Sequence, residues 1–222
     1  MAPKLIVMLT YNDRTIENAM EIFEECKDAP VEYWGFKDIG IKLEEMRKLV
    51  NEMKKARKIT FLEPLRETEE ECLDSAKAAL ECKFDYVVGA IYHGSVSKLL
   101  RSTTIKYIPT CGKRSGIPRV LEGSIEEIIA DGRRLEKAGV DGLSLSVFRY
   151  KGNPEELAER FLKEIEIPIM FSGSINNYNR LGFVKKMNPW AFTIGSAFFN
   201  NEFGKDLSIK DQINEVLEYL EQ

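Results

Sequence analysis

Two short stretches in the last quarter of the chain decide how the rest is interpreted: Phe171-Ser172-Gly173-Ser174-Ile175 and Thr193-Ile194-Gly195-Ser196-Ala197. Each is a short apolar run that leads into a Gly-Ser pair. Glycine lets backbone N–H groups come close to an anion because it has no Cβ, and serine adds a hydroxyl donor. Two such strand ends, side by side, would form a cup for a phosphate group. The predicted cup residues are Gly173, Ser174, Gly195 and Ser196.

Upstream of these stretches, apolar runs alternate with segments of helical periodicity. The predicted strands occupy residues 5–10, 31–36, 58–62, 86–91, 105–110, 142–147, 167–171 and 191–194. The predicted helices occupy residues 15–26, 43–56, 69–82, 95–102, 125–138, 154–165 and 209–221. Continuous apolar strands separated by helices imply a parallel sheet that is covered on its faces. About eight such units predict a single-domain (β/α)₈ barrel of the α/β class that spans residues 1–222.

Local signals support the helix positions and weaken the main alternative, an open doubly wound sheet. Capping-box spacings, which mark helix starts, join Thr68 to Glu71, Ser124 to Glu127 and Asn153 to Glu156. A doubly wound dinucleotide-binding sheet would place a glycine-rich turn after its first strand. Tyr11, Asn12 and Asp13 stand there instead, so the barrel is favoured.

The composition narrows the class of partner. The chain has 222 residues, of which 31% are charged, and a formal net charge of −4, so we expect neither a nucleic-acid nor a membrane partner. No signal peptide is visible before the first predicted strand. Four scattered cysteines without a C-x-x-C motif, together with a single histidine, predict reduced thiols, a cytoplasmic location, no metal site and no cofactor.

The last two predicted units, 169–175 and 191–197, resemble the closing motifs of the phosphate-binding barrels. That group includes the histidine-biosynthesis isomerases, phosphoribosylanthranilate isomerase, ribulose-phosphate epimerase and related aldolases. The resemblance implies that the backbone at these two turns holds a substrate phosphate. It does not identify a reaction, because the histidine-pathway isomerases have an Asp at the end of the fifth strand, and no Asp follows Thr110. The epimerases have several metal-binding histidines, whereas this chain has only His93.

Catalytic groups in such a barrel lie at the carboxyl ends of the strands. Lys37 follows the aromatic second strand, and Glu63 ends the third, so we expect both side chains to point into the same mouth. A carboxylate at Glu63 suits proton abstraction beside a carbonyl, and Lys37 can serve as a nucleophile, a base or a cation that stabilises an enolate. The alternative is a structural ion pair between them, or between Lys37 and Asp38. Asp13, near the end of the first strand, is a further candidate catalytic residue.

The remaining candidates follow the fourth to sixth strands. His93 is the only side chain whose ordinary pKa lies near neutrality, so it is a candidate general acid, or else a solvated loop residue. Arg149 has the planar fork that suits a carboxylate or a second phosphate, and Asp38 is a candidate substrate-binding residue. Lys113 and Arg114 lie in a basic loop, which we expect to be a solvated turn rather than a lid, and Cys111 is expected to pack in the core.

We therefore expect an enzyme that binds a small phosphorylated substrate and carries out proton transfer or C–C cleavage beside a carbonyl, as an isomerase, epimerase or aldolase. Lys37 and Glu63 would be the central pair, supported by Asp13, His93 and Arg149. The alternative is a non-catalytic barrel that senses a phosphorylated metabolite. Either kind of protein can form a homo-oligomer.

Overall fold

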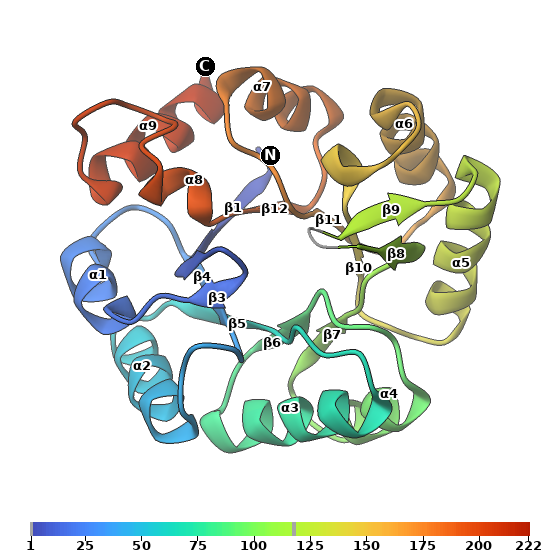
Figure 1. Ribbon diagram of the computed structural model, residues 1–222, viewed down its shortest axis with the longest axis horizontal. Coiled ribbons are helices and arrows are strands. Elements are labelled where there is room, and N and C mark those ends of the chain that lie inside the picture. The colour runs from blue at the N-terminus through green and yellow to red at the C-terminus, as the bar shows by residue number, and fades with distance from the viewer. Residues whose placement is uncertain (1, 117–118) are drawn as a thin grey trace.

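The computed structural model describes residues 2–116 and 119–222 and contains one large parallel sheet curled into a barrel (Figure 1). Its eight strands lie in the order β10-β11-β12-β1-β4-β5-β6-β7. Their bounds are β1 (Lys4–Met8), β4 (Tyr33–Lys37), β5 (Ile59–Glu63), β6 (Tyr86–Val88), β7 (Lys106–Ile108), β10 (Leu143–Leu145), β11 (Ile169–Phe171) and β12 (Ala191–Ile194). The barrel closes between β7 and β10, where the Ser144 N–H donates to the Pro109 carbonyl at 2.9 Å and the Cys111 N–H donates to the Ser144 carbonyl at 3.0 Å. The predicted (β/α)₈ barrel is confirmed.

Helices surround the strands on the outside (Figure 1). They are α1 (Ala19–Cys26), α2 (Leu43–Lys55), α3 (Glu69–Cys82), α4 (Gly94–Arg101), α5 (Ile125–Lys137), α6 (Pro154–Glu164), α7 (Tyr178–Met187), α8 (Ser196–Phe199) and α9 (Ile209–Glu221). The capping boxes at Thr68 and Ser124 are present as predicted. Asn153 caps α6 by accepting from two backbone N–H groups, with Pro154 in the first helical turn.

Side chains alternate between two apolar regions, as the period of a strand requires. The barrel interior is filled by Ile6, Met8, Tyr33, Phe61, Val88, Ile108, Met170 and Ala191. The intervening residues Trp34, Phe36 and Leu62 pack outward against the helices. On β4 and β5 the inward positions therefore continue to Lys37 and Glu63, which are paired with each other in the sheet register. A filled interior leaves the mouth of the barrel as the place for a ligand.

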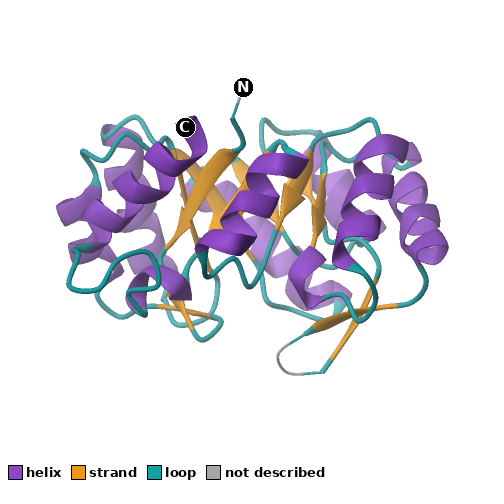
Figure 2. Cartoon of the chain, turned by 90° about the horizontal axis from the view of Figure 1, so that it is seen from above, coloured by secondary structure: helices purple, strands orange, loops and turns teal. Residues whose placement is uncertain are grey.

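Two short antiparallel hairpins lie at the mouth, at the carboxyl ends of the barrel strands (Figure 2). The first joins β2 (Thr10–Tyr11) to β3 (Arg14–Thr15), and the second joins β8 (Lys113–Ser115) to β9 (Val120–Glu122). Neither hairpin was predicted. The first occupies the start of the predicted helix at 15–26, so α1 begins only at Ala19. Asn12 and Asp13 adopt left-handed φ values of 48° and 60° at its turn, a conformation that Asn and Asp tolerate better than most residues.

Among the described residues, no helix has both the length and the apolar character needed to cross a membrane. The four cysteines, Cys26, Cys72, Cys82 and Cys111, are free and buried.

Candidate active site

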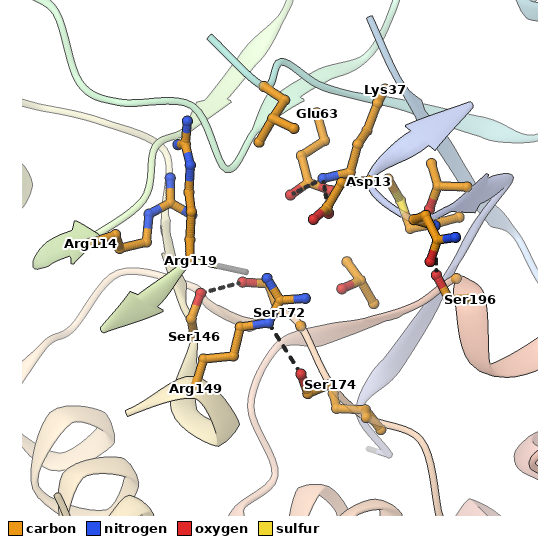
Figure 3. A pocket seen from close by; sticks show the side chains of 18 of the residues that line it. Asp13, Lys37, Glu63, Arg114, Arg119, Ser146, Arg149, Ser172, Ser174 and Ser196 are labelled. Atoms are coloured by element: carbon orange, nitrogen blue, oxygen red, sulfur yellow. Dashed lines mark hydrogen bonds and ion pairs between the residues drawn. The ribbon is translucent and has the colours of Figure 1, made fainter. Parts of the chain in front are cut away.

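A cavity of about 720 Å³ opens at the mouth of the barrel (Figure 3). Most of the residues predicted from the sequence line it: Asp13, Lys37, Glu63, Arg149, Gly173, Ser174, Gly195 and Ser196. The other two predicted residues, Asp38 and His93, do not line it. The cavity therefore brings three of the four predicted catalytic residues, Asp13, Lys37 and Glu63, and the predicted phosphate cup into one space.

Lys37 lies between two carboxylates on one wall of the cavity (Figure 3). Its Nζ donates to Asp13 Oδ1 at 3.1 Å and forms an ion pair with Glu63 Oε1 at 3.4 Å. Only 7% of the Lys37 side chain is exposed, against 19% for Glu63 and 41% for Asp13. The lysine is thus the inner member of the trio, and the two carboxylates are the members that a ligand can reach more easily.

The local sequence explains how each member of this trio is placed. Lys37 and Glu63 are the last residues of neighbouring strands, so the parallel register puts them side by side. Asp13 comes to them from the turn of the β2–β3 hairpin. That hairpin is fixed to the barrel by Thr15, whose hydroxyl donates to the Lys37 carbonyl at 2.7 Å and accepts from the Lys37 N–H at 3.0 Å. These two hydrogen bonds hold the hairpin against the end of β4.

Burial alone would raise the pKa of the Asp13 carboxyl. The Lys37 ammonium, through its charge and its hydrogen bond, outweighs that effect, and the more distant Arg149 and Arg119 act in the same direction. The pKa of Asp13 consequently lies below its ordinary value, and the group is an anion at neutral pH.

The two Gly-Ser turns lie at the ends of β11 and β12. Gly173 and Ser174 have φ values of 79° and 61°, in the left-handed region where glycine is favoured. A Cβ on Gly173 would lie 2.9 Å from Arg149 Nε, and one on Gly195 would lie 2.6 Å from Thr10 Oγ1, so both positions need the close approach that glycine allows.

The backbone N–H groups of Ser174 and Ser196 donate no hydrogen bond to any other described residue. The Ser196 hydroxyl accepts from the Asn12 N–H at 3.3 Å, which joins the β12 turn to the first hairpin. Such free N–H groups at the edge of a cavity can bind the oxygens of an anion.

Hydroxyl groups and Arg149 continue the cup toward β10. Arg149 lies in the short 3₁₀ helix Val147–Arg149, and its Nε donates to the Ser174 hydroxyl at 3.1 Å. Ser172, in the centre, accepts from the Ser144 hydroxyl at 2.9 Å and lies 3.3 Å from the Ser146 hydroxyl. Ser144 and Ser146 were missed as site-supporting residues. The two serines are two residues apart in the predicted sixth strand and therefore lie on the same face of it, and this spacing could have identified them.

Arg114 and Arg119 line the cavity from the β8–β9 hairpin (Figure 3). The solvated turn predicted for Lys113 and Arg114 is therefore wrong for Arg114, and both residues lie on strand β8 rather than in a turn. Lys113 and Ser115 are exposed, whereas Arg114 between them points the opposite way and donates to the Gly89 carbonyl at 3.1 Å. Burial, together with repulsion from Arg119, lowers the pKa of Arg114 to about 10, although the Glu63 carboxylate acts against this. Sequence reasoning missed Arg119 because the hairpin that places it was not recognised.

Asp38 is next to Lys37 in sequence, but its side chain points the other way and is 5% exposed. Its carboxylate accepts from the Leu65 N–H at 3.0 Å, from Arg66 Nε at 2.8 Å and from the Ser75 hydroxyl at 2.7 Å. These contacts fix the loop between β5 and α3. Asp38 thus stabilises a loop outside the cavity. Lys37 pairs with Asp13 and Glu63, and not with Asp38 as the alternative prediction had it.

His93 and Cys111 do not line the cavity that contains the trio. His93 precedes α4, and its buried Nε2 has no hydrogen-bond partner among the described residues. Cys111 is fully buried, its Sγ donates to the Ile128 carbonyl, and burial raises the pKa of its thiol. That environment agrees with the predicted packing role. Within residues 2–116 and 119–222, no cluster of three or more His, Cys, Asp or Glu side chains is arranged to hold a metal ion.

Comparison with known proteins identifies the fold and leaves the individual activity open. No protein-family model matches the sequence, and no curated protein matches it. Among solved structures, orotidine 5′-phosphate decarboxylase from Pyrococcus horikoshii is similar with a TM-score of 0.69 and 15% identity, covering 98% of this chain and 99% of that one. The N-acetylmannosamine-6-phosphate 2-epimerase of Clostridium perfringens has a TM-score of 0.65 and 13% identity, covering 97% and 92%.

A third solved structure, N-(5′-phosphoribosyl)anthranilate isomerase from Pyrococcus furiosus, has a TM-score of 0.65 and 13% identity, and covers 99% of this chain and 98% of that one. The names of all three enzymes specify phosphorylated compounds. At these identities the likeness shows a shared fold, and it confirms the resemblance to phosphate-binding barrels at the level of architecture.

Proposed function

We propose that this protein is an enzyme that binds a small phosphorylated metabolite and carries out proton transfer or C–C cleavage beside a carbonyl, as an isomerase, epimerase or aldolase. One observation carries the proposal. Lys37 is held between the Asp13 and Glu63 carboxylates in the same cavity as the two Gly-Ser turns. A phosphate on the turns would place the rest of a small metabolite within the cavity that the trio lines.

In this proposal each residue has a separate role. The Gly173–Ser174 and Gly195–Ser196 turns bind the phosphate through backbone N–H groups, and Arg149 adds a cation beside them. Glu63, the carboxylate beside Lys37 on the neighbouring strand end, takes a proton from the carbon next to the carbonyl. The Lys37 ammonium stabilises the oxygen that becomes negative, and Asp13 keeps Lys37 in position. A role for His93 as a general acid stays a prediction from the sequence.

The first step of the test is to identify the metabolite that the protein binds. Protein purified gently and denatured should release a phosphorylated metabolite that mass spectrometry can identify. Incubating that compound with the protein in D₂O should replace a carbon-bound hydrogen beside its carbonyl by deuterium, or cleave the compound, as NMR detects. Glu63→Gln should reduce this rate by about a thousandfold or more while retaining binding. Glu52→Gln is the control, because the partly exposed Glu52 carboxylate pairs with Lys55 on the outer surface.

Two outcomes would contradict the proposal. Tight binding of the metabolite without exchange, cleavage or isomerisation would favour the sensing barrel. Wild-type rates in Glu63→Gln would show that the carboxylate does not transfer the proton.

A further inference from the structure

The cavity carries more positive charge on one wall than the binding of one phosphate requires. Arg114, Arg119 and Arg149 all line it, on the side formed by the β8–β9 hairpin and the end of β10 (Figure 3). Within the described structure, neither Arg114 nor Arg149 forms an ion pair with a carboxylate. The residues outside the described structure, Met1, Ile117 and Pro118, have no acidic side chain that could supply one.

The arginines are held in place in ways that leave their charge available. Among the residues that the structure describes, the hydrogen-bond partner of Arg114 is neutral, the Gly89 carbonyl at 3.1 Å. Arg119 pairs with Glu67 at 3.0 Å, but 77% of the Glu67 side chain is exposed, so water screens this pair and a ligand can replace it. Both arginines also border a second, smaller cavity of about 480 Å³, which Tyr92 and Arg134 line as well, so the space beside them extends beyond the main cavity.

A purely structural role does not explain this arrangement well. A mostly buried guanidinium without an ion pair, such as that of Arg114, is costly, and three guanidinium groups on one wall repel one another. Burial and repulsion from Arg119 and Arg149 also lower the pKa of Arg114, which means that the charged form of this side chain is destabilised at this position. An anion bound between Arg114 and Arg119 would remove this cost. The phosphate cup is formed elsewhere, by the turns after β11 and β12, and Arg149 is the arginine bound to it through Ser174.

We propose that Arg114 and Arg119 form a second anion subsite, and that the substrate is a phosphorylated compound with a second anionic oxygen group, either a carboxylate or another phosphate. The inference rests on the proposed function and adds the substrate class to it. The phosphate would bind at the Ser174 and Ser196 turns, and the second group at the hairpin. The carbon atoms between the two groups would lie in the same cavity as Lys37 and Glu63.

The experiment compares compounds that differ only in the second charge. Alkylphosphonates carry one anionic group, ω-phosphonocarboxylates of equal chain length add a carboxylate, and α,ω-diphosphonates add a second phosphonate. Their affinities are measured by calorimetry for chains of increasing length. For the wild type, one of the doubly anionic series should bind about tenfold more tightly than the matching alkylphosphonate at its best length. Whichever series gains more identifies the second group.

Arg114→Gln and Arg119→Gln should each remove most of this gain and leave the affinity for alkylphosphonates within about twofold of the wild type. Lys113→Gln is the matched control, because it removes one positive charge from the same hairpin at an exposed position. Thermal unfolding checks that each variant is folded. Arg119 is close to the hairpin turn, and its partner Glu67 is an exposed carboxylate. The Arg119→Gln variant therefore keeps the test valid if Arg114→Gln fails to fold.

The proposal is overturned if no chain length binds better with a second anionic group, or if Lys113→Gln reduces the gain as much as Arg114→Gln does. The outcomes also separate it from the proposed function. Failure of the alkylphosphonates alone to bind would refute the phosphate cup, and arginine-dependent binding of the phosphonocarboxylates would then still support the second subsite.

Discussion

The two walls of the cavity use charge in opposite ways. On the wall formed by β4, β5 and the first hairpin, one cation, Lys37, is neutralised by the carboxylates of Asp13 and Glu63. On the wall formed by the second hairpin and β10, Arg114 and Arg149 have hydrogen-bond partners that carry no charge. In the functions proposed above, the first wall transfers protons and the second binds anions. The following predictions test this difference, from the largest expected effect to the smallest.

Lys37→Met should cause the largest loss of stability. It leaves Asp13 and Glu63 as two carboxylates without their shared cation, and Lys37 itself is 7% exposed. We expect the free energy of unfolding, measured in urea at pH 7, to fall by about 3 kcal/mol. Lys27→Met removes a lysine from an exposed pair with Glu24 and should change stability little. Equal effects in the two variants would mean that the trio is no more than a surface ion pair.

Sulfate should raise the free energy of unfolding by binding at the wall that the second hairpin and β10 form. Binding at a hundredfold excess over the dissociation constant adds about 2.7 kcal/mol to the free energy of unfolding. Arg149→Gln should reduce this gain by more than half, since Arg149 lies beside the Ser174 turn. Lys37→Met should keep the gain. Arg133→Gln is the control, because Arg133 is an exposed residue of α5 that pairs with Glu164 of α6. A loss of the gain in this variant would indicate a general effect of net charge.

Asp38→Asn should lower the free energy of unfolding by about 2 kcal/mol, because the carboxylate accepts three hydrogen bonds in a nearly buried position. Calorimetry should show an unchanged affinity for alkylphosphonates, because Asp38 lies outside the cavity. Asp74→Asn, which breaks an exposed pair with Lys77, controls for the loss of an acidic side chain. Weaker phosphonate binding in Asp38→Asn would restore the substrate-binding role predicted from the sequence.

The smallest effect concerns pH. Since the pKa of Asp13 is lowered from its ordinary value of 3.8 in the folded protein, its ion pair stabilises the fold above that pH. This contribution is lost as the pH falls through the lower, folded-state pKa. At neutral pH, Asp13→Asn should therefore be less stable than the wild type by less than about 1 kcal/mol, because the side chain is 41% exposed. Urea unfolding over a range of pH should show the difference vanishing in acid, and a difference that persists there would rule out this linkage.

The sequence was a good guide wherever the chain follows the regular period of strands and helices. The alternation of Tyr33, Gly35 and Lys37 with Trp34 and Phe36 correctly predicted which side chains face the barrel interior. The Gly-Ser turns and the ends of β4 and β5 were therefore found in the cavity as expected. The prediction failed in the segments that connect the strands to the helices. There it missed the two hairpins, and it did not foresee that the Asp38 side chain points away from that of Lys37.

The sequence by itself determined the barrel, the inward direction of Lys37 and Glu63, and the place of the Gly-Ser turns, because each follows from local periodicity and backbone chemistry. Only the tertiary structure decided which charges are neutralised. Asp13 reaches Lys37 across 24 residues and Arg66 reaches Asp38 across 28, and the β8–β9 hairpin turns Arg114 inward and Lys113 outward. Such pairings depend on how separate loops meet in space, and an ion pair between distant residues leaves no periodic trace in the sequence.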